Sequence, residues 1–427
     1  MPETTDLPAN FRKLSAVERR QVLRQNFRLT EEEIEATEGG AHMLDLAEIM
    51  VESAVGVMSV PMGLAHGFVV DGVLRSVPLA VEEPSVVAAA GYAAAIIRRS
   101  GGFASWADEP VMTAQVILSD CRSRAEETIR AHEADLRTQI EPLLAGMSSR
   151  GGGYRGMEVT RLPQTGLVRL HLHVDVRDAM GANILNSVAE RAADYLCNTL
   201  RCAKLMAILT NAAAGRIAGA RFSLPVERLA RGQFNGAEIA ERIVLATELA
   251  NEDRDRAVTH NKGVMNGVSS LALATGNDTR GIEAAVHAYA ARSGEYRSLT
   301  HYRVEDGQLH GSFEAPLPFG VVGGAVGFHP GSRFALKLLG EPDAPTLSRI
   351  AAAVGLAQNF AALYALVTEG IQQGHMRLHS NRLAWMAGAR GEEIPAVAEQ
   401  IGRSKRFNAD AAREALRSIR NGAAKTD

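Results

Sequence analysis

The pattern of hydrophobic residues changes near residue 111, and this change restricts the possible folds more than any other feature of the chain. From there to residue 209, short alternating segments typical of strands lie between helical segments. The order is β-α-β-β-α-β, which predicts a small ferredoxin-like domain. Its predicted strands are 111–118, 158–161, 167–176 and 204–209, its predicted helices are 122–144 and 182–200, and 220–224 is a further strand candidate.

The segments on either side of this insert are mainly helical. Ser15 with Glu18 and Thr30 with Glu33 fit capping boxes, so two short helices are expected near the N-terminus. Asp71-Gly72 suits the two-residue turn of a hairpin. Further helices are predicted at 43–55, 84–99, 229–250 and 346–368, a strand-rich segment at 299–311, and a helical appendage from 371 onward.

Charge and cysteine content narrow the function classes. The 46 Lys and Arg residues nearly balance the 49 Asp and Glu residues, which argues against a nucleic-acid binder. Three cysteines cannot form a disulfide framework in a chain of 427 residues, so a reducing compartment is expected. The N-terminal residues have no apolar stretch, and apolar runs such as 86–97 are too short to span a bilayer. A cytoplasmic protein with no membrane or nucleic-acid partner is therefore predicted.

Two familiar nucleotide motifs are excluded. Residues 151–156 satisfy GxGxxG, but a helix precedes them and a strand follows, the reverse of the dinucleotide-binding order. We interpret them as a flexible linker. The chain has no GxxxxGK[ST] sequence, which excludes a P-loop site.

Two histidine arrangements raise the possibility of a metal. His171, His173 and Asp175 alternate on one predicted strand, and we favour a polar outer face over a metal site. His375 and His379 are four residues apart without the glutamate of HExxH, which favours a single functional histidine over a zinc pair.

For each of four polar segments, the sequence allows both a structural role and a functional role. Residues 178–183 follow a strand and precede a helix, so they form either a phosphate site or a plain capped turn. Glu83 either stabilises a helix start or, if buried, donates a proton. Lys262, in a predicted glycine-flanked loop, is either a surface residue or a group that stabilises an oxyanion. Asp278 is either an ordinary turn residue or part of a functional site.

Together these segments resemble one family, 3-hydroxy-3-methylglutaryl-CoA (HMG-CoA) reductase, and its soluble bacterial class II branch in particular. The similarity follows the family's order from about residue 42 to 391. The matching segments are VEEPSVVAAA (81–90), VDVRDAMGAN (174–183), THNKGVMNG (259–267), ALATGNDTRGIEA (272–284), VGLAQN (354–359) and TEGIQQGHMRLH (368–379).

The resemblance implies an α+β fold in three parts. Residues 1–110 and 216–370 would form a large helical CoA-binding domain. Residues 111–215 would form a small ferredoxin-like domain that binds the nicotinamide cofactor without a Rossmann fold, and residues 371–427 a C-terminal helical flap. Family members are dimers or multiples of dimers, with the active site at the subunit interface.

The resemblance also implies a reaction, the four-electron reduction of HMG-CoA to mevalonate and CoA with two NADH or NADPH and no metal. Lys262 matches the lysine that stabilises the developing oxyanion. His375 matches the acid that protonates the departing CoA thiolate. Glu83 matches the glutamate that protonates the second alkoxide and would be buried to do so. Asp278 matches the aspartate that couples to the lysine and the glutamate.

Substrate and cofactor residues carry over in the same way. Arg256 matches the arginine that meets the HMG carboxylate. The other implied substrate residues are Ser85, Asn211, Asn266 and Gln358, and the implied cofactor residues are Asp178, Met180, Gly181 and Asn183. Glu141 is the candidate acid that would bond the ribose 2′-hydroxyl and repel a 2′-phosphate, which favours NADH over NADPH.

Two segments depart from the family pattern. Ser53 replaces the asparagine of the family's E-N-x-x-G, and residues 325–328 lack its threonine and lysine. The alternatives to a reductase are a catalytically silent HMG-CoA-binding homologue and a metal hydrolase built on His171, His173 and Asp175. A third possibility is the same enzyme working as a mevalonate oxidase in catabolism.

Overall fold

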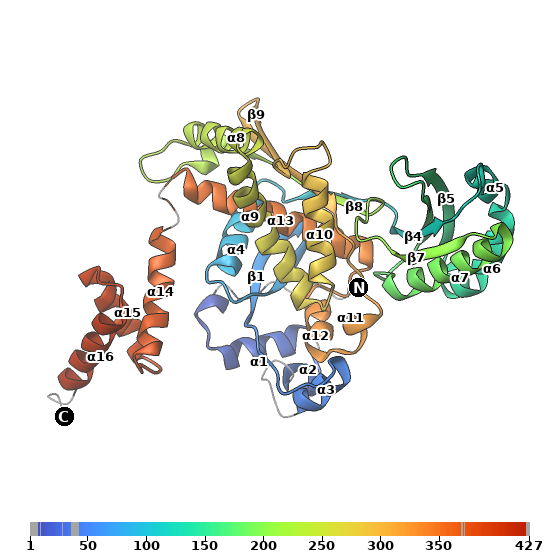
Figure 1. The fold of residues 1–427 in the computed structure, drawn as a ribbon. Coiled ribbons are helices and arrows are strands. Elements are labelled where there is room, and N and C mark those ends of the chain that lie inside the picture. Colours follow the sequence, from blue (N-terminus) through green and yellow to red (C-terminus); the bar gives the residue numbers. More distant parts are fainter. Residues whose placement is uncertain are drawn as a thin grey trace.

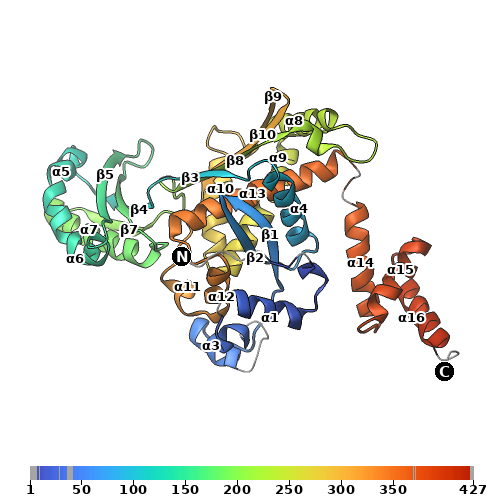
Figure 2. The same ribbon diagram turned by 180° about the vertical axis from the view of Figure 1, so that it is seen from behind.

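The computed structural model describes residues 7–8, 10–27, 29–35, 42–368, 370 and 372–423. The chain forms a central body, a small domain at one end and a three-helix unit at the other (Figures 1 and 2). Each part has its own cluster of buried hydrophobic side chains. This mixed α and β architecture confirms the fold class predicted from the sequence.

A single long helix forms the core of the central body. α13 (Ala344–Leu366) packs against α4 (Val86–Arg98), α9 (Arg254–Ala274) and β8 (Ile217–Pro225). It is long and apolar enough to cross a membrane, but 78% of its most apolar 18-residue stretch is buried in the protein. A helix that is hydrophobic on all sides in this way is a core helix.

The central body contains a four-stranded sheet and a separate hairpin. β3 (Ala104–Ala107), β8, β10 (Gln308–Pro316) and β9 (Thr300–Glu305) pair in that order, and all neighbours are antiparallel. β1 (Met62–Val70) and β2 (Val73–Ala80) form the predicted hairpin. Asp71 and Gly72 take φ values of 50° and 80°, as a type I′ turn requires.

Shorter helices complete the central body. The two predicted capping boxes are confirmed, since Ser15 and Thr30 each exchange backbone-to-side-chain hydrogen bonds with the glutamate three residues later. The remaining elements are η1 (Phe11–Lys13), α1 (Ala16–Phe27), α2 (Glu31–Glu35), α3 (His42–Met50), η2 (Val226–Leu229), α8 (Gly236–Glu252), α10 (Thr279–Ala290), α11 (Gly324–Phe328) and α12 (Pro330–Leu338).

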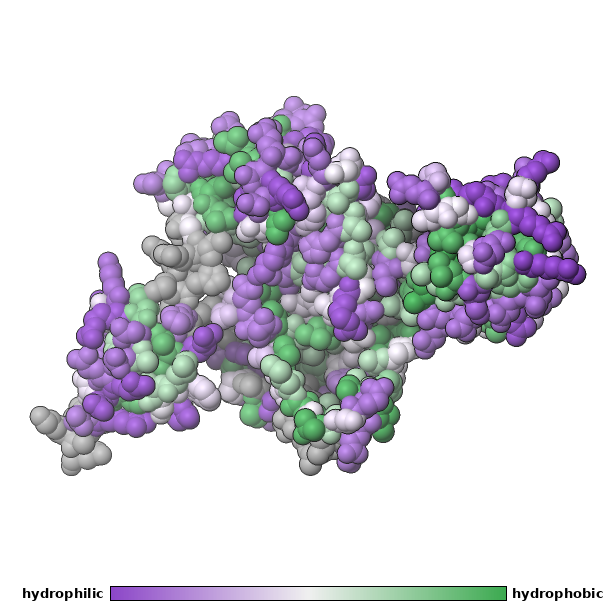
Figure 3. Space-filling view, in the orientation of Figure 1, coloured by the Kyte–Doolittle hydropathy of each residue, from purple (hydrophilic) through white to green (hydrophobic). Residues whose placement is uncertain are grey.

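The small domain has the predicted ferredoxin-like topology. β4 (Val111–Ser119), β5 (Gly153–Arg161), β6 (Val168–Asp175) and β7 (Ala203–Leu209) form an antiparallel sheet of order β5-β6-β4-β7. α5 (Ala125–Ala131), α6 (Glu133–Ser148) and α7 (Ala182–Leu200) share its core. β7 exposes Leu205, Met206 and Ile208, and hydrophobic surface gathers around this strand in Figure 3.

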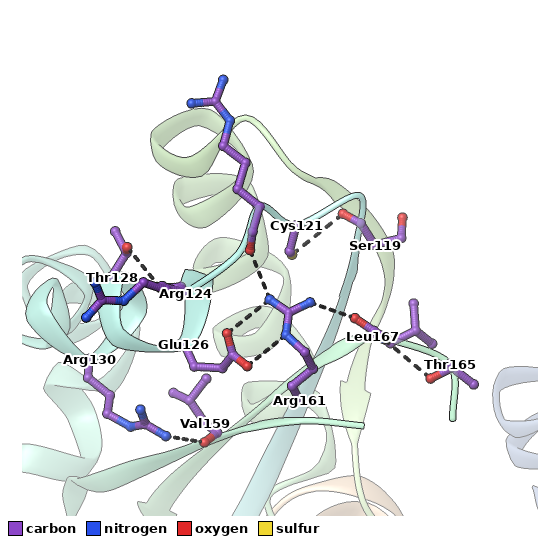
Figure 4. Close-up of polar contacts among 12 residues, drawn as sticks. Ser119, Cys121, Arg124, Glu126, Thr128, Arg130, Val159, Arg161, Thr165 and Leu167 are labelled. Carbon is purple, nitrogen blue, oxygen red and sulfur yellow. Dashed lines mark hydrogen bonds and ion pairs between the residues drawn. The ribbon is translucent and has the colours of Figure 1, made fainter. Parts of the chain in front are cut away.

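One arginine holds the loops at the far end of this domain. Arg161 binds both carboxylate oxygens of Glu126, at 2.8 and 3.0 Å, and donates to the carbonyls of Arg122 and Gly166 (Figure 4). This network anchors the loop after β4, which carries Cys121.

The C-terminal unit consists of α14 (Gln372–Met386), α15 (Glu393–Ser404) and α16 (Ala409–Ala423). These helices pack on one another around residues such as Val397 and Leu416. In both views they stand apart from the central body (Figures 1 and 2).

Several predicted elements differ from the structure. The predicted helix 122–144 is two helices, α5 and α6, separated at His132. The strand candidate 220–224 belongs to β8 in the central sheet, and α3 ends at Met50 rather than Val55. Residues 151–156 are no flexible linker, because β5 begins at Gly153 and Arg177 and Arg155 donate to the carbonyl of Gly151.

The largest difference concerns Lys262, which lies in a helix and not in a loop. α9 starts at the N-cap Asp253, whose side chain accepts from the backbone of Arg256. Its Asn and Gly residues disfavour a helix locally, but Val264, Val268 and Leu271 are fully buried in the core. Gly267 lets α13 approach closely, since a Cβ there would lie 2.9 Å from Val354. Tertiary packing therefore outweighs the local preference for a turn.

Candidate active site

An ion pair joins two of the sequence-predicted catalytic residues. Glu83 lies in the turn between β2 and α4, and Lys262 projects from α9. Lys262 Nζ is 2.7 Å from Glu83 Oε2. The side chain of Lys262 is 57% exposed and that of Glu83 is 36% exposed, so Glu83 has only part of the burial that would favour its neutral, proton-donating form. The pair therefore presents a cation and a carboxylate at an open surface.

Ser85 sits beside this pair in a strained backbone conformation. Its φ of 74° is left-handed, which costs a residue with a side chain free energy. It is the N-cap of α4, yet its hydroxyl makes no capping hydrogen bond. The hydroxyl is thus available to a ligand at the Glu83–Lys262 pair.

Three more predicted substrate residues lie along α9 and α13. Arg256 is half-buried, burial lowers the pKa of its guanidinium, and no carboxylate of the described residues pairs with it. Gln358 is 4% exposed, and its buried Oε1 has no hydrogen-bond partner. Asn266 is half-buried one turn after Lys262 on α9. An unpaired cation on the helix that carries Lys262, and an unsatisfied amide on the helix packed against it, suit a polar, anionic substrate.

Asp278 and Asn211 occupy a different place. Asp278 is the N-cap of α10, and its Oδ1 accepts from Gly281 N at 3.1 Å and lies 3.6 Å from Arg280 Nη2. A Cβ at Gly281 would lie 3.0 Å from Asp278 Oδ2 and 3.4 Å from Asn211 Oδ1, so these two side chains are neighbours. Twelve residues of α9 separate Lys262 from the helix end, about 18 Å at 1.5 Å per residue. Within one chain, Asp278 therefore does not join the Glu83–Lys262 pair.

The predicted cofactor loop leads into the longest helix of the small domain. Gly181 is the N-cap of the 19-residue α7 with a φ of 93°, and a Cβ there would lie 2.7 Å from Val176 Cγ1. Asn183 is exposed on the first turn, and Met180 is half-buried. Asp178 instead has a structural role, since its Oδ1 accepts from Ala344 N at 3.0 Å. A glycine-started helix N-terminus with an exposed amide fits the pyrophosphate of a dinucleotide.

Glu141 lies on α6, which leads toward the glycine cluster. Its Oε1 accepts from Ser148 Oγ at 2.9 Å, and its Oε2 is 3.8 Å from Arg137 Nε. The side chain is 42% exposed. Glu141 therefore presents a partly exposed carboxylate ten residues before Gly151, and its role toward the ribose stays a prediction.

His375 belongs to α14, but its side chain lies outside the described residues. The other histidine arrangement does not form a metal site. Asp175 is fully buried, 2.7 Å from Arg155 Nη2 and 3.3 Å from Arg177 Nη2. His171 and His173 instead contact Gln115 and Thr113. Across the described part of the chain, no three His, Cys, Asp or Glu side chains are arranged to hold a metal ion.

Comparison with known proteins decides the family. The sequence profile described as hydroxymethylglutaryl-coenzyme A reductase matches residues 15–380. A 3-hydroxy-3-methylglutaryl-coenzyme A reductase of Archaeoglobus fulgidus is 41% identical over 426 residues, which cover 96% of this chain and 94% of that protein. A probable enzyme of the same name from Borreliella burgdorferi is 36% identical and covers 88% and 86%. The chain belongs to the HMG-CoA reductase family.

Solved structures agree with this assignment. A reductase from Streptococcus pneumoniae superposes with a TM-score of 0.81 at 37% identity, covering 96% of this chain and 99% of that one. A second structure from that organism, described as class II and bound to NADPH in open conformations, has a TM-score of 0.79 at 38% identity. It covers 95% of this chain and all of the other. The class II resemblance seen in the sequence is confirmed.

Some residues that organise the candidate site were not predicted from the sequence. Arg216, Asn277 and Gly320 connect the cofactor loop to the turn that holds Asp278. A lone arginine in the small, apolar segment NAAAGRIAGA was the one available signal for Arg216. His260, which is 1% exposed beside Arg256, was also missed because its burial depends on contacts with Ser298 and Thr300.

Proposed function

We propose that this chain reduces HMG-CoA to mevalonate and CoA. Membership of the reductase family supports this function, and the observation that carries it is the 2.7 Å contact between Lys262 Nζ and Glu83 Oε2. A silent binding homologue would need no such pair of an ammonium and a carboxylate. Two reduced nicotinamide dinucleotides, bound one after the other, would each supply one hydride.

Lys262 stabilises charge in both reduction steps. Hydride addition to the thioester carbonyl leaves a negative charge on oxygen, and addition to the aldehyde does so again. An ammonium group held beside that oxygen lowers the barrier to both additions. Its contact with Glu83 fixes where the ammonium sits before substrate binds.

Glu83 and His375 handle the protons. The first addition forms a hemithioacetal, which collapses to mevaldehyde and CoA thiolate, and His375 protonates that sulfur. The second addition forms an alkoxide, which takes a proton through Glu83 to give the alcohol of mevalonate. Each step is reversible, so the same site oxidises mevalonate where metabolite ratios favour it.

The HMG carboxylate binds at Arg256. A half-buried guanidinium without a carboxylate partner is a costly arrangement that a substrate carboxylate relieves. Gln358 offers its unsatisfied Oε1 to a substrate hydroxyl, and Ser85 and Asn266 complete the polar lining.

The active site is completed between two copies of the chain. Each chain holds one half-site with Glu83 and Lys262 near the middle of α9. Beyond the C-terminal end of α9 it holds a second half-site with Asp278, Asn211 and the cofactor loop. A two-fold dimer brings unlike halves together. Residues 49–62 support an interface, since this segment exposes Val55 fully and Met58 to 93%. Hydrophobic surface also gathers at the end of the molecule where α3 lies (Figure 3).

The cofactor is NADH in preference to NADPH. Residues 178–183 would hold the pyrophosphate at the N-terminus of α7, through backbone amides and Asn183. The carboxylate of Glu141 would accept from the ribose 2′-hydroxyl and repel a 2′-phosphate. A cytoplasmic location goes with this cofactor use.

The direct test is nicotinamide absorbance with purified protein, HMG-CoA, and NADH or NADPH in separate cuvettes. We expect two cofactors oxidised for each HMG-CoA, and faster oxidation of NADH. Lys262→Ala should lower the rate of both reduction steps by about 10²- to 10³-fold, since one oxyanion-stabilising group contributes that much. A folded Lys262→Ala variant with near-normal activity would overturn the proposed mechanism.

A further inference from the structure

A buried arginine links the small domain to the central body. Arg216 lies in the segment that leads from β7 to β8 and is 4% exposed. Its Nη1 donates to the carbonyl of Ala179 at 3.1 Å, and its Nη2 donates to the carbonyl of Phe319 at 2.5 Å. Ala179 belongs to the cofactor loop, and Phe319 follows β10 in the central body. One guanidinium therefore bonds to both parts at once.

The charge of Arg216 is not held by an ion pair. No carboxylate of the described residues lies within salt-bridge distance, and the charges of Asp175 and Asp178 act on it only from further away. Burial lowers the pKa of its guanidinium to about 10, so the group stays protonated at neutral pH. A buried cation bonded only to carbonyls is an expensive way to gain stability. The forked guanidinium of Arg216 donates to two carbonyls at once, which a shorter or neutral side chain could not do.

Residues 319–321, which Arg216 holds through the carbonyl of Phe319, also contact the turn that precedes Asp278. Gly320 N donates to Asn277 Oδ1 at 2.7 Å, and Asn277 directly precedes Asp278. On the other side, Val321 N donates to the carbonyl of Asp178 at 2.8 Å. Residues 319–321 thus form a short bridge between the cofactor loop and the turn of Asp278.

The absence of a side chain at Gly320 lets residues 319–321 pack closely on the cofactor loop. A Cβ there would lie 2.5 Å from Met180 N and 3.0 Å from the carbonyl carbon of Ala179. The backbone of the bridge therefore packs directly on the backbone of the cofactor loop, and Asn277 at 9% exposure seals the other side. Backbone packed on backbone leaves little room for relative movement.

We propose that Arg216 is a positioning residue that sets the distance between the bound nicotinamide and Asp278, by clamping the cofactor loop and residues 319–321 together. This inference rests on the proposed reductase function. The inference goes beyond the proposed function because it names the residue that holds the cofactor and the carboxylate of Asp278 at a fixed distance within one half-site. Arg216 touches neither substrate nor cofactor.

The test compares Arg216→Gln with Arg75→Gln. Arg75 is a matched control, a half-buried arginine that donates to the carbonyl of Leu339 at 2.7 Å within the central body. For each full-length variant we would measure kcat, KM for the cofactor, the dissociation constant of HMG-CoA, and the isotope effect with cofactor deuterated at the transferred hydrogen. Amide hydrogen exchange of residues 178–181 and 319–322 gives a second readout, which does not depend on activity.

We expect Arg216→Gln to lower kcat/KM for the cofactor by about 10- to 100-fold, the usual effect of a displacement near 1 Å. The isotope effect should rise, because hydride transfer becomes slower than product release, while HMG-CoA binds as before. Exchange should accelerate in both segments. Arg75→Gln should leave all of these as in the wild type. A merely structural role would lower the amount of folded enzyme and leave KM and the isotope effect unchanged, which would overturn the proposal.

Two further outcomes are distinguishable. A wild-type protein that oxidises no cofactor with HMG-CoA contradicts the proposed function, and hydrogen exchange then still decides whether Arg216 clamps the two segments. Unchanged exchange in Arg216→Gln contradicts the clamp whatever the activity. If Arg216→Gln does not fold, Arg216→Lys keeps the charge but reaches one carbonyl, and the same shifts are expected in smaller measure.

Discussion

A buried histidine shows how single residues set up this site. His260 lies four residues after Arg256 and two before Lys262, and burial lowers its pKa to about 3. Ser298 Oγ donates to the carbonyl of Thr300, and Thr300 Oγ1 donates to Asn359 Oδ1. Both hydroxyl protons are thus committed, so His260 Nε2 is the donor to these oxygens. A neutral imidazole therefore anchors the catalytic part of α9 without repelling Arg256.

This histidine predicts a pH dependence of stability. The unfolded chain binds a proton at His260 near pH 6.5, whereas the folded chain stays neutral there until about pH 3. Stability from this group is therefore complete above pH 6.5 and declines as the pH falls, by up to about 1.4 kcal/mol per unit. Unfolding by denaturant between pH 7 and 5 should show this decline, and His260→Gln should lack it. The exposed His301→Gln serves as the control and should keep the wild-type slope; equal slopes in all three proteins would contradict the assignment.

At the level of residues, the sequence pointed to Glu83, Lys262 and Arg256 because their motifs resemble a known family. It could not show that Glu83 pairs with Lys262, since 179 residues separate them and only the packing of α4 and β2 on α9 brings them together. The role of Arg216 could not be predicted either, because it also depends on contacts between residues far apart in the sequence. Its partners, Ala179 and Phe319, come from two distant segments.

At the level of elements, the sequence predicted correctly those turns and helix caps that depend only on neighbouring residues. The Asp71-Gly72 turn and the two capping boxes depend on neighbouring residues, and all three are present. α9 was misjudged because its Gly and Asn residues resemble a loop, whereas contacts with α13 hold it helical. Helix propensity is a weak guide when a helix is buried.

Two glycines in the small domain make a matched pair of predictions. Gly146 lies inside α6 with open space around it, so Gly146→Ala should stabilise the protein by about 0.5–1 kcal/mol. Gly151 has a φ of 83°, and a Cβ there would lie 3.0 Å from Arg177 Nη2, so Gly151→Ala should destabilise it by about 1 kcal/mol or more. Thermal or denaturant unfolding measures both. The same sign for the two substitutions would contradict the local geometry.

The whole molecule separates its candidate catalytic residues between the middle of α9 and the turn beyond the C-terminal end of α9. The Glu83–Lys262 pair belongs to the central body, while Asp278 lies next to the junction with the small domain. Such a division is inefficient in a single chain and natural in a dimer with two-fold symmetry. The exposed apolar segment 49–62 is the surface that this arrangement would cover.

Assembly can be tested by charging that segment. Met58→Asp places a carboxylate at a side chain that is 93% exposed in one chain but buried in the proposed interface. We expect light scattering to show a dimer or larger assembly for the wild type and a 45.6 kDa monomer with little activity for the variant. Val17→Asp, at an exposed apolar residue of α1, is the control and should change neither mass nor activity. A monomeric, fully active wild type would contradict the shared active site.

Both hydride additions can be followed into the product with an isotope label. Purified protein would be incubated with HMG-CoA and a nicotinamide cofactor that carries deuterium at the transferred position, and the mevalonate analysed by mass spectrometry. Two successive additions to one carbonyl carbon predict two deuterium atoms on the alcohol carbon that was the thioester. Mevalonate with a single deuterium, or no labelled product from folded protein, would contradict the account.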